Sequence, residues 1–295
     1  MDKNNNNEKL TKVGINWYPG HMAKTKRLIK ENINLIDIIY EVIDSRVPIS
    51  SKIIDIDTLI NNKPRILIMT KYDLCDKEET DKFIKYYESL GYNVLKYDLT
   101  SNKSVDEIFT LSNKILSEKI ERMRAKGLKK DTIRALVIGI PNVGKSTLIN
   151  KIVGRKSTTT GNKPGVTKQL SWVKAYKNIE LLDSPGILWP KLDQDKVAYN
   201  LASTTAIKEE ILEKEEIAIY ILNFLSKYYS NILKENYKLE DVSDIEEAFN
   251  IIGKNKGAIS KGGIINYDKV TDIIINDIKQ GKLKGITFDR YEDVK

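Results

Sequence analysis

The stretch GIPNVGKST, residues 139–147, decides the fold of this chain. It matches the pattern G-x4-G-K-[ST], in which glycines let the backbone curl around a phosphate group. An apolar run (133–139) precedes the pattern and a helical stretch (147–153) follows it, as a phosphate-binding loop requires. Backbone N–H groups and the positive end of the helix would then bind a nucleotide phosphate. The residues expected to contact the nucleotide here are Asn142, Val143, Gly144, Lys145, Ser146 and Thr147.

A second motif, an apolar run that ends in D-x-x-G, follows the loop. Its Asp183 is expected to hold magnesium through a water molecule, while Ser146 ligates the ion directly. The N–H of Gly186 would contact the γ-phosphate. Thr167, in a loop rich in Gly and Pro between the two motifs, lies where a switch threonine closes on magnesium and the γ-phosphate. Lys145, which would reach the β- and γ-phosphates, and Thr167 are therefore candidate catalytic residues.

Selection of the base requires a carboxylate, because guanine presents two adjacent N–H donors that one Asp can accept together. The usual N-K-x-D motif is absent after the phosphate-binding loop, but upstream an apolar run (65–70) ends in T-K-Y-D. Asp73 would then specify guanine, Lys71 would pack its stem on the base, and Thr70 would replace the usual Asn. The lost amide predicts a modestly weaker affinity. A segment after the next strand is assigned to the base by its position alone, and comprises Asp98, Leu99 and Thr100.

The base-binding motif thus precedes the phosphate-binding loop, which is the order of a circularly permuted GTPase. Such a cut can leave the arrangement of strands in space unchanged, because the termini of a domain are often close together. The apolar runs are nearly continuous and helical stretches separate several of them, which predicts a mostly parallel sheet covered on both faces. Strands are expected at 36–44, 65–70, 92–98, 133–139, 170–176 and 179–183, and one helix, capped by Ser104 and Glu107, at 104–127.

The chain is expected to divide into three parts. Residues 1–16, with a short Asn run and no apolar periodicity, predict a flexible leader, and 17–190 form the permuted GTPase domain. Residues 191–295 predict a small all-α domain. The D-x-x-G motif would lie next to this domain, so loss of the γ-phosphate would act on it directly. Helices are expected there at about 194–206, 209–230, 244–252 and 267–280, the third capped by Asp244 and Glu247.

Composition narrows the class of protein further. The 295 residues are 41% hydrophobic, enough for a sizeable core, and a single Cys excludes a disulfide framework and a Cys-based zinc site. No apolar run is long enough to span a membrane, and the N-terminal residues lack the features of a secretory signal or transit peptide, so a cytoplasmic location is expected. The net charge of +8 is concentrated in residues 1–190, which suggests a polyanionic partner.

The combined motifs resemble the ribosome-assembly GTPase A family (the RbgA/YlqF type). This resemblance implies hydrolysis of GTP, a helical C-terminal domain, and a role in late maturation of the large ribosomal subunit. It extends over nearly the whole chain after the leader. It is carried by NWYPGHMAKTKR (16–27), VIDSRVPISS (42–51), TKYD (70–73), GIPNVGKSTLIN (139–150), KPGVT (163–167), LLDSPGILWPK (181–191) and GGIINYDK (262–269).

Two catalytic assignments depend on this resemblance. Many GTPases have a Gln after D-x-x-G that positions water, but this chain has Ile187, whose apolar side chain cannot orient a nucleophile. Composition alone favours a surface or capping role for the single histidine, His21. The resemblance implies instead that His21 acts in hydrolysis, moving toward the γ-phosphate when the partner is engaged. It also implies that Asn142 can help to coordinate potassium, the alternative being an Asn that only maintains the shape of the loop.

Three functions compete. The first is a GTPase that uses magnesium, binds the large-subunit precursor and its rRNA in the GTP state, leaves after hydrolysis, and is a monomer off the ribosome. The second is a GTP-gated switch with a protein target, and the third a vestigial GTP site on an RNA-binding protein. Intact Lys145, Thr167 and Asp183 argue against the third. The basic surplus favours RNA over a protein, because cations that face phosphates release counterions.

Overall fold

The computed structural model describes residues 20–54, 56–127, 132–154, 170–175, 178–187, 195–207 and 212–294. Within these ranges a six-stranded sheet has the order β3-β2-β1-β4-β6-β5. Neighbouring strands are parallel except for the edge strand β5, which is antiparallel to β6. The prediction of a mostly parallel sheet is therefore confirmed. The strands are β1 (Ile38–Asp44), β2 (Arg65–Thr70), β3 (Asn93–Lys96), β4 (Ile133–Ile138), β5 (Ser171–Lys174) and β6 (Ile179–Asp183).

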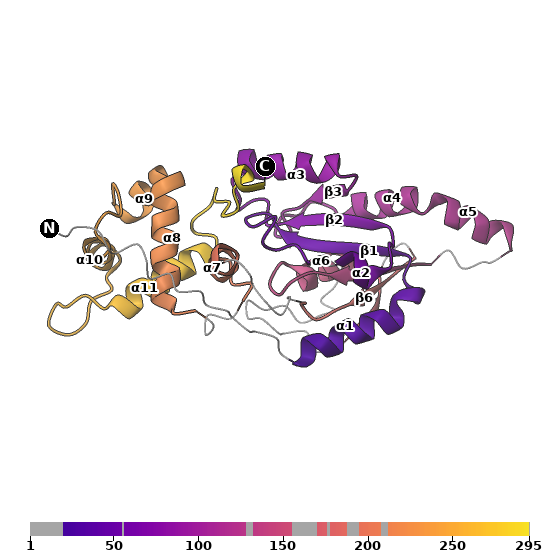
Figure 1. The fold of residues 1–295 in the computed structure, drawn as a ribbon, viewed down its shortest axis with the longest axis horizontal. Helices are drawn as coiled ribbons and strands as arrows, with labels where there is room; N and C mark the ends of the chain where they lie inside the picture. Colours follow the sequence, from indigo (N-terminus) through magenta and orange to yellow (C-terminus); the bar gives the residue numbers. More distant parts are fainter. Residues whose placement is uncertain are drawn as a thin grey trace, which may run out of the picture.

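The phosphate-loop strand β4 lies near the middle of the sheet, between β1 and β6. The strands β1 and β2 come earlier in the chain and lie on one side of it, while β6 and β5 come later and lie on the other. A chain cut between the base-binding and phosphate-binding halves gives this arrangement, so the fold is that of a circularly permuted P-loop domain. Figure 1 shows the sheet with helices around it and a separate group of helices beside it.

Alternating side chains of the central strands pack on opposite faces of the sheet. Leu67 and Met69 of β2 pack with Phe83 and Tyr87 of helix α3 (Lys77–Ser89). The intervening residues of β2 point into the larger cluster on the other face. All seven residues of β1 are buried, which explains why its sequence is a nearly continuous apolar run.

The helices fall into two groups, one around the sheet and one beside it (Figure 1). Those associated with the sheet are α1 (Gly20–Asn32), α2 (Ile56–Ile60), α3, α4 (Asp106–Ile115), α5 (Ser117–Ala125) and α6 (Lys145–Val153). Residues 195–279 form a helical region that contains α7 (Asp195–Ser203), α8 (Lys214–Tyr228), α9 (Ser230–Tyr237), α10 (Ile245–Lys256) and α11 (Tyr267–Lys279). Short 3-10 turns occur at η1 (Ile33–Leu35) and η3 (Tyr291–Val294). No helix in the described parts of the chain has the length and apolarity needed to cross a membrane.

The single helix expected at 104–127 is wrong in two respects. The structure has two helices, α4 and α5, separated at the buried residue Leu116. The first begins at Asp106, and the Ser104 hydroxyl accepts from the Asp106 N–H instead of capping with Glu107. The break coincides with a change of surroundings, because α4 buries residues against the sheet whereas α5 buries none. The sequence pattern shows which face of a helix is apolar, but it does not show where the sheet beneath that helix ends.

The predictions for the helical region agree more closely with the structure. Asp244 caps α10 as expected, accepting from the Glu247 N–H at 3.0 Å. The helical pattern expected at 209–230 corresponds to α8, which begins at Lys214 and is followed by an unpredicted helix, α9. The helices α7 and α11 lie close to their predicted positions.

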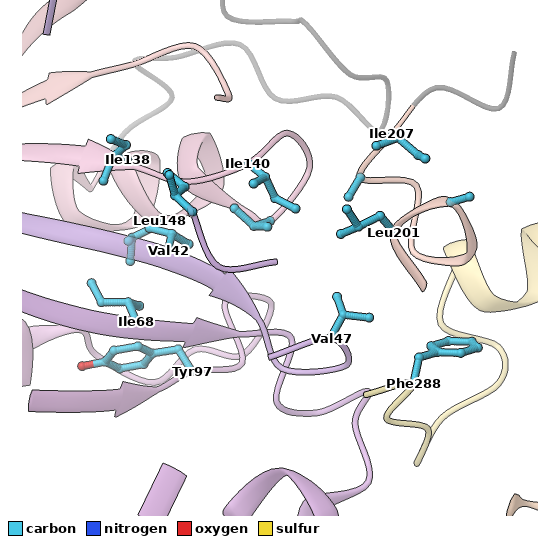
Figure 2. Packing of buried hydrophobic residues seen from close by; sticks show 14 of the residues in the cluster. Val42, Val47, Ile68, Tyr97, Ile138, Ile140, Leu148, Leu201, Ile207 and Phe288 are labelled. Atoms are coloured by element: carbon cyan, nitrogen blue, oxygen red, sulfur yellow. The ribbon is translucent and has the colours of Figure 1, made fainter. Parts of the chain in front are cut away.

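The helical region and the sheet share one hydrophobic core. Val47, which follows β1, lies in the same cluster as Leu201 and Ile207 from the helical region (Figure 2). Phe288, near the end of the chain, also belongs to this cluster, and its N–H donates to the Arg46 carbonyl at 2.7 Å. The last residues therefore return to the sheet. The boundary expected at 190/191 stays a prediction, and the leader at 1–16 lies outside the described residues.

Candidate functional site

Loops that follow four neighbouring parallel strands meet at one edge of the sheet. The carboxyl ends of β1, β2, β4 and β6 face the same way, and ligand sites of open α/β sheets lie at such an edge. Two hydrogen bonds join loops that are far apart in the chain. The Thr70 hydroxyl donates to the Val143 carbonyl, and Lys71 Nζ donates to the Asn142 carbonyl at 2.8 Å. The predicted base-binding and phosphate-binding segments are thus brought together.

The phosphate-binding loop has the tight geometry that its glycines predict. Gly144 has a φ of 98°, a left-handed conformation that favours glycine, and α6 begins at the next residue. A side chain at Gly139 would come within 2.4 Å of the Val42 carbonyl oxygen, so the loop can leave β4 only with glycine there. The first turn of α6 contains Lys145, Ser146 and Thr147, which places its N-terminal N–H groups at the loop.

A buried lysine and carboxylate are paired electrostatically beside this loop. Lys145 is buried and its Nζ donates to the Ile140 carbonyl at 2.7 Å. Burial lowers the pKa of Lys145 to about 8, although the charge of Asp183 opposes this shift. Burial likewise raises the pKa of Asp183 to about 6, against the charge of Lys145. The Oδ1 atom of Asp183 is buried and has no hydrogen-bond partner among the residues that the structure describes.

The D-x-x-G segment lies directly against the phosphate-binding loop. A side chain at Gly186 would come within 2.6 Å of the Pro141 nitrogen, so only glycine permits this approach. The Ile187 N–H donates to the Gly139 carbonyl at 3.1 Å. The Ile187 side chain is fully buried in the core. A group other than Ile187 must therefore orient the attacking water.

The Thr70 hydroxyl connects the base-binding motif to the phosphate-binding loop. Its buried hydroxyl lies between two carbonyl oxygens, that of Ile43 at 3.1 Å and that of Val143 at 2.5 Å. The hydroxyl has one hydrogen, so it can donate to one of these oxygens at a time. Donation to Val143 links the base-binding motif directly to the phosphate-binding loop.

Asp73 and the segment 98–101 are neighbours, and Leu99 lies against Gly144 of the phosphate-binding loop. Burial raises the pKa of Asp73, and the negative charge of Asp98 adds to this shift. Asp98 closes its own turn, since its Oδ1 accepts from the Thr100 N–H at 2.8 Å. Lys151 of α6 donates to the carbonyls of Leu99 and Ser101, which fixes the segment beside the phosphate helix. The Thr100 N–H is thus already bonded within the turn.

A buried ion cluster, Asp44–Arg46–Lys71, supports the base-binding motif and was not recognised from sequence. The Oδ2 atom of Asp44 accepts from Lys71 Nζ and from Arg46 Nη2, both at 2.8 Å. Its Oδ1 accepts from the Arg46 N–H and Nε, both at 3.0 Å. Although burial opposes ionisation, the charges of Arg46 and Lys71 hold the pKa of the Asp44 carboxyl well below its usual range. The sequence feature that could have indicated this cluster is the opposite charge of Asp44 and Arg46 at the end of a buried strand.

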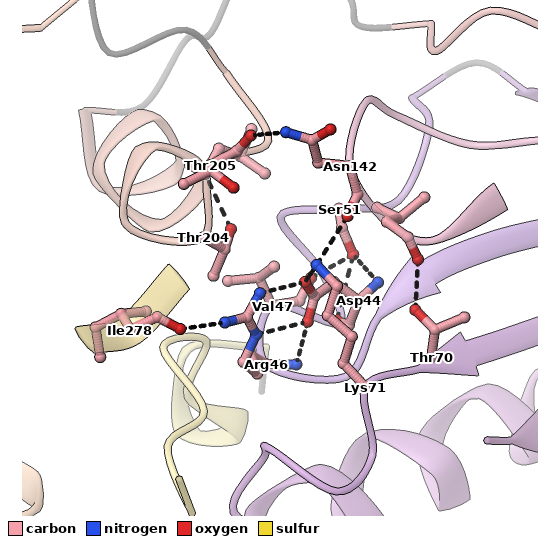
Figure 3. Close-up of polar contacts among 12 residues, drawn as sticks. Asp44, Arg46, Val47, Ser51, Thr70, Lys71, Asn142, Thr204, Thr205 and Ile278 are labelled. Carbon is pink, nitrogen blue, oxygen red and sulfur yellow. Dashed lines mark hydrogen bonds and ion pairs between the residues drawn. The ribbon is translucent and has the colours of Figure 1, made fainter. Parts of the chain in front are cut away.

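Two hydrogen bonds connect the site to the helical region (Figure 3). Arg46 Nη1 donates to the Ile278 carbonyl of α11 at 3.1 Å. On the other side of the site, Asn142 Nδ2 donates to the Thr205 carbonyl, beyond the end of α7, at 2.6 Å. The phosphate-binding loop and the ion cluster therefore contact different segments of that region.

Two predicted catalytic residues are not positioned by these contacts. His21 is the second residue of α1, and the described structure covers its backbone but not its side chain. Thr167 and the rest of KPGVT lie outside the described residues. The roles proposed for both stay predictions.

The fold and the site together define a P-loop GTPase with circularly permuted motifs. The sequence profile described as 50S ribosome-binding GTPase matches residues 134–256, beginning on β4 and leaving the upstream base-binding motif outside the match. The chain is 45% identical to Ribosome biogenesis GTPase A of Priestia megaterium, over 93% of this chain and 96% of that one. It is 30% identical to the probable ribosome biogenesis GTPase A of Mycoplasma genitalium, over 95% and 98%.

A solved structure of GNP-bound YlqF from T. maritima has the same fold. It matches with a TM-score of 0.62 at 24% identity, over 90% of this chain and 98% of that one. The chain belongs to the ribosome biogenesis GTPase A family. It is accordingly a guanine-nucleotide-binding protein that hydrolyses GTP, and the family inferred from its motifs is confirmed.

We expect Asp73→Asn to change the choice of base. A carboxylate accepts both guanine donors, whereas an amide supplies one donor and one acceptor, which suits xanthine better. GDP affinity should fall by about tenfold to a hundredfold, the effect of losing a bidentate contact, while XDP affinity rises. Equilibrium titration with fluorescent GDP and XDP would measure both affinities.

The matched control is Asp98→Asn, in the neighbouring turn. Since the Asp98 carboxylate bonds within its own turn, this variant should weaken both nucleotides alike and leave their ratio unchanged. Equal hydrolysis of ATP and GTP by the unmodified protein would show that the TKYD assignment is wrong.

Proposed function

We propose that this chain hydrolyses GTP on the precursor of the large ribosomal subunit, binds rRNA there in the GTP state, and leaves after hydrolysis. The observation that carries the proposal is the direct bonding of the nucleotide site to the helical region through Asn142 and Arg46. A loop that rearranges with the γ-phosphate can bias the position of helices to which it is hydrogen-bonded. The names of the relatives supply the ribosomal context.

Magnesium is the metal that the proposed reaction needs, and the site fits it. The buried Oδ1 of Asp183, which lacks a hydrogen-bond partner among the described residues, is the kind of hard oxygen that magnesium prefers. Asp183 would hold the ion through water, with the Ser146 hydroxyl as a direct ligand and Thr167 closing on it. When bound, magnesium neutralises charge on the phosphates. Lys145, buried beside Asp183, would contact the same phosphates.

The proposal includes a potassium ion at Asn142, with one restriction on the atom that can bind it. The side-chain nitrogen of Asn142 donates to the Thr205 carbonyl, so a potassium ion would be held through the side-chain oxygen. The same hydrogen bond also fits the alternative, in which Asn142 fixes the shape of the loop. Comparison of GTP turnover in potassium and sodium buffers separates the two roles.

The proposed partner is rRNA because the positive charge is concentrated in the first two-thirds of the chain. Binding to phosphates releases counterions, so affinity for an RNA partner falls steeply as salt rises. A GTP-gated switch with a protein target is the competing function and predicts no such dependence. A monomer off the ribosome and a cytoplasmic location complete the proposal, and both stay predictions.

The direct test is GTP turnover with and without isolated large subunits. We expect the subunits to stimulate hydrolysis, and binding in the presence of a non-hydrolysable GTP analogue to exceed binding with GDP. The logarithm of the apparent affinity should decrease linearly with the logarithm of the salt concentration. Turnover that is indifferent to subunits, together with salt-independent binding, would favour the protein-target alternative.

We expect His21→Ala to reduce subunit-stimulated turnover by about 100-fold, the usual order for a group that positions or deprotonates a nucleophile. Ile187 is buried and cannot serve, and His21 is the only imidazole in the chain. GTP affinity should hardly change, because the loop, magnesium and the base pocket provide it. Single-turnover measurements on subunits, with GTP affinity measured separately, test both expectations.

The unstimulated rate should fall less, since α1 is expected to dock fully only on the ribosome. The variant should then remain on the precursor with GTP bound. Unaltered stimulated turnover in His21→Ala would falsify the role, leaving Thr167 or potassium at Asn142 as the groups that manage the water.

A basic turn in the helical region is a further proposed RNA contact. Lys254 and Lys256 end α10, and Lys261 follows on a turn closed by the Ser260 N–H donating to the Ile264 carbonyl at 2.8 Å. All three lysines are exposed. Changing them together to Glu should weaken subunit binding by at least tenfold, because three attractive contacts with phosphate become repulsive. GTP affinity should be unaffected, since the turn does not touch the nucleotide site.

The control for this experiment carries the same change of charge elsewhere. Lys77 and Lys85 of α3 and Lys227 of α8 are exposed, and their triple change to Glu should leave subunit binding within about twofold. Equal effects of the two triple variants would show that net charge alone matters and would return the turn to the role of an inter-helix connection.

A further inference from the structure

A basic groove lies at the opposite edge of the sheet from the nucleotide site. It is bounded by α4, α5 and the segments that enter β1 and β2, and its volume is about 780 Å³. Ile36 and Leu116 are buried at its base, and Ile115 and Met123 are partly buried along it. Five cations line it, namely Lys63, Lys114, Lys119, Arg122 and Lys126.

Two acidic residues neutralise only part of this charge. Lys119 is paired with Asp37, and Arg122 with Glu118 at 2.9 Å. Within the described parts of the chain, no carboxylate lies within salt-bridge distance of the remaining three cations, which are Lys63, Lys114 and Lys126. The groove therefore presents three uncompensated positive charges above an apolar base. An anion is the complementary occupant.

The arrangement of these cations suits a polyanion better than a single phosphate. Lys114 lies in the last turn of α4, Arg122 in the last turn of α5 and Lys126 directly after α5. At the rise of an α-helix they span at most roughly 18 Å. Successive phosphates of one strand are about 3.4 Å apart along a nucleic-acid helix, so the row can follow several of them. The helix α5 buries none of its residues and extends beyond the sheet, which leaves the row accessible (Figure 1).

The groove and the nucleotide site are separated by the length of the sheet. The residues that line the groove precede β1 and β2, whereas the nucleotide loops follow these strands. At about 3.3 Å per residue, the seven residues of β1 place roughly 20 Å between the two edges. An occupant of the groove thus leaves the site free. The basic turn after α10 is more distant still, beyond the opposite side of the sheet (Figure 1).

We propose that this groove binds the phosphate backbone of rRNA and does so whichever nucleotide is bound. The inference rests on the proposed ribosomal function and assigns it a second RNA contact. The contact is with the backbone, because lysines recognise phosphates as point charges and carry no code for sequence. The groove contributes the same affinity in both nucleotide states, so release after hydrolysis comes from weaker contacts of the helical region.

The test is the triple change of Lys63, Lys114 and Lys126 to Glu, compared with the control triple on α3 and α8. Binding to isolated large subunits should weaken by at least tenfold with GDP and with a non-hydrolysable GTP analogue alike. The slope of log affinity against log salt should decrease by about two to three, since up to three phosphate contacts are lost. GDP affinity and thermal unfolding should match those of the unmodified protein, which shows that the fold is intact.

A second measurement, titration of a fluorescent single-stranded RNA, makes the result independent of the ribosome. The groove variant should lose affinity for this RNA and the control should not. Equal RNA binding by the groove variant and the unmodified protein overturns the proposal, whatever the subunits do. Weaker subunit binding with an unchanged salt slope and unchanged RNA binding also overturns it, since the occupant is then a protein. If the unmodified protein neither binds the subunits nor is stimulated by them, the proposed function is wrong. The RNA titration then still tests whether the groove binds RNA.

Discussion

The carboxylate of Asp44 is the contact on which the arrangement of this site depends. It lies at the end of the fully buried strand β1 and accepts hydrogen bonds from both Arg46 and Lys71. Lys71 in turn bonds to the phosphate-binding loop, and Arg46 bonds to α11. Removing the carboxylate would leave the buried Arg46 and the partly buried Lys71 without their counter-charge, and breaking a buried ion pair in this way costs about 3–5 kcal/mol. Through these two cations, the Asp44 side chain links the base-binding motif to the phosphate-binding loop and to the helical region.

Sequence reasoning recovered the parts of this site that are local patterns. The phosphate-binding loop, TKYD and D-x-x-G each carry their chemistry within a few consecutive residues, and the structure brings all three to one edge of the sheet. Arg46 bonds instead to a partner 232 positions away, the Ile278 carbonyl. No periodicity encodes such a pairing. The division of 104–127 into two helices escaped for a related reason, since it depends on where the sheet ends beneath them.

The Thr70 position shows a contact that the sequence pattern alone does not reveal. In sequence the residue reads as the loss of an amide and hence of affinity. In the structure its hydroxyl bonds to the Val143 carbonyl, so Thr70 links the base-binding motif to the phosphate-binding loop, and the weaker affinity stays a prediction. By contrast, sequence and structure lead to the same conclusion for Ile187. Its side chain is apolar and is buried in the core, so it cannot orient a water molecule.

The bond between Asn142 and Thr205 has an energetic consequence. Thr205 has a φ of 62°, a left-handed conformation that is unusual for a β-branched residue and costs on the order of 1–3 kcal/mol. The residue is buried, and its carbonyl is held by the Asn142 amide. The chain after α7 is therefore wound against its own preference, and the phosphate-binding loop helps to restrain it. This hydrogen bond therefore couples the conformation of the phosphate-binding loop to that of the strained residue after α7.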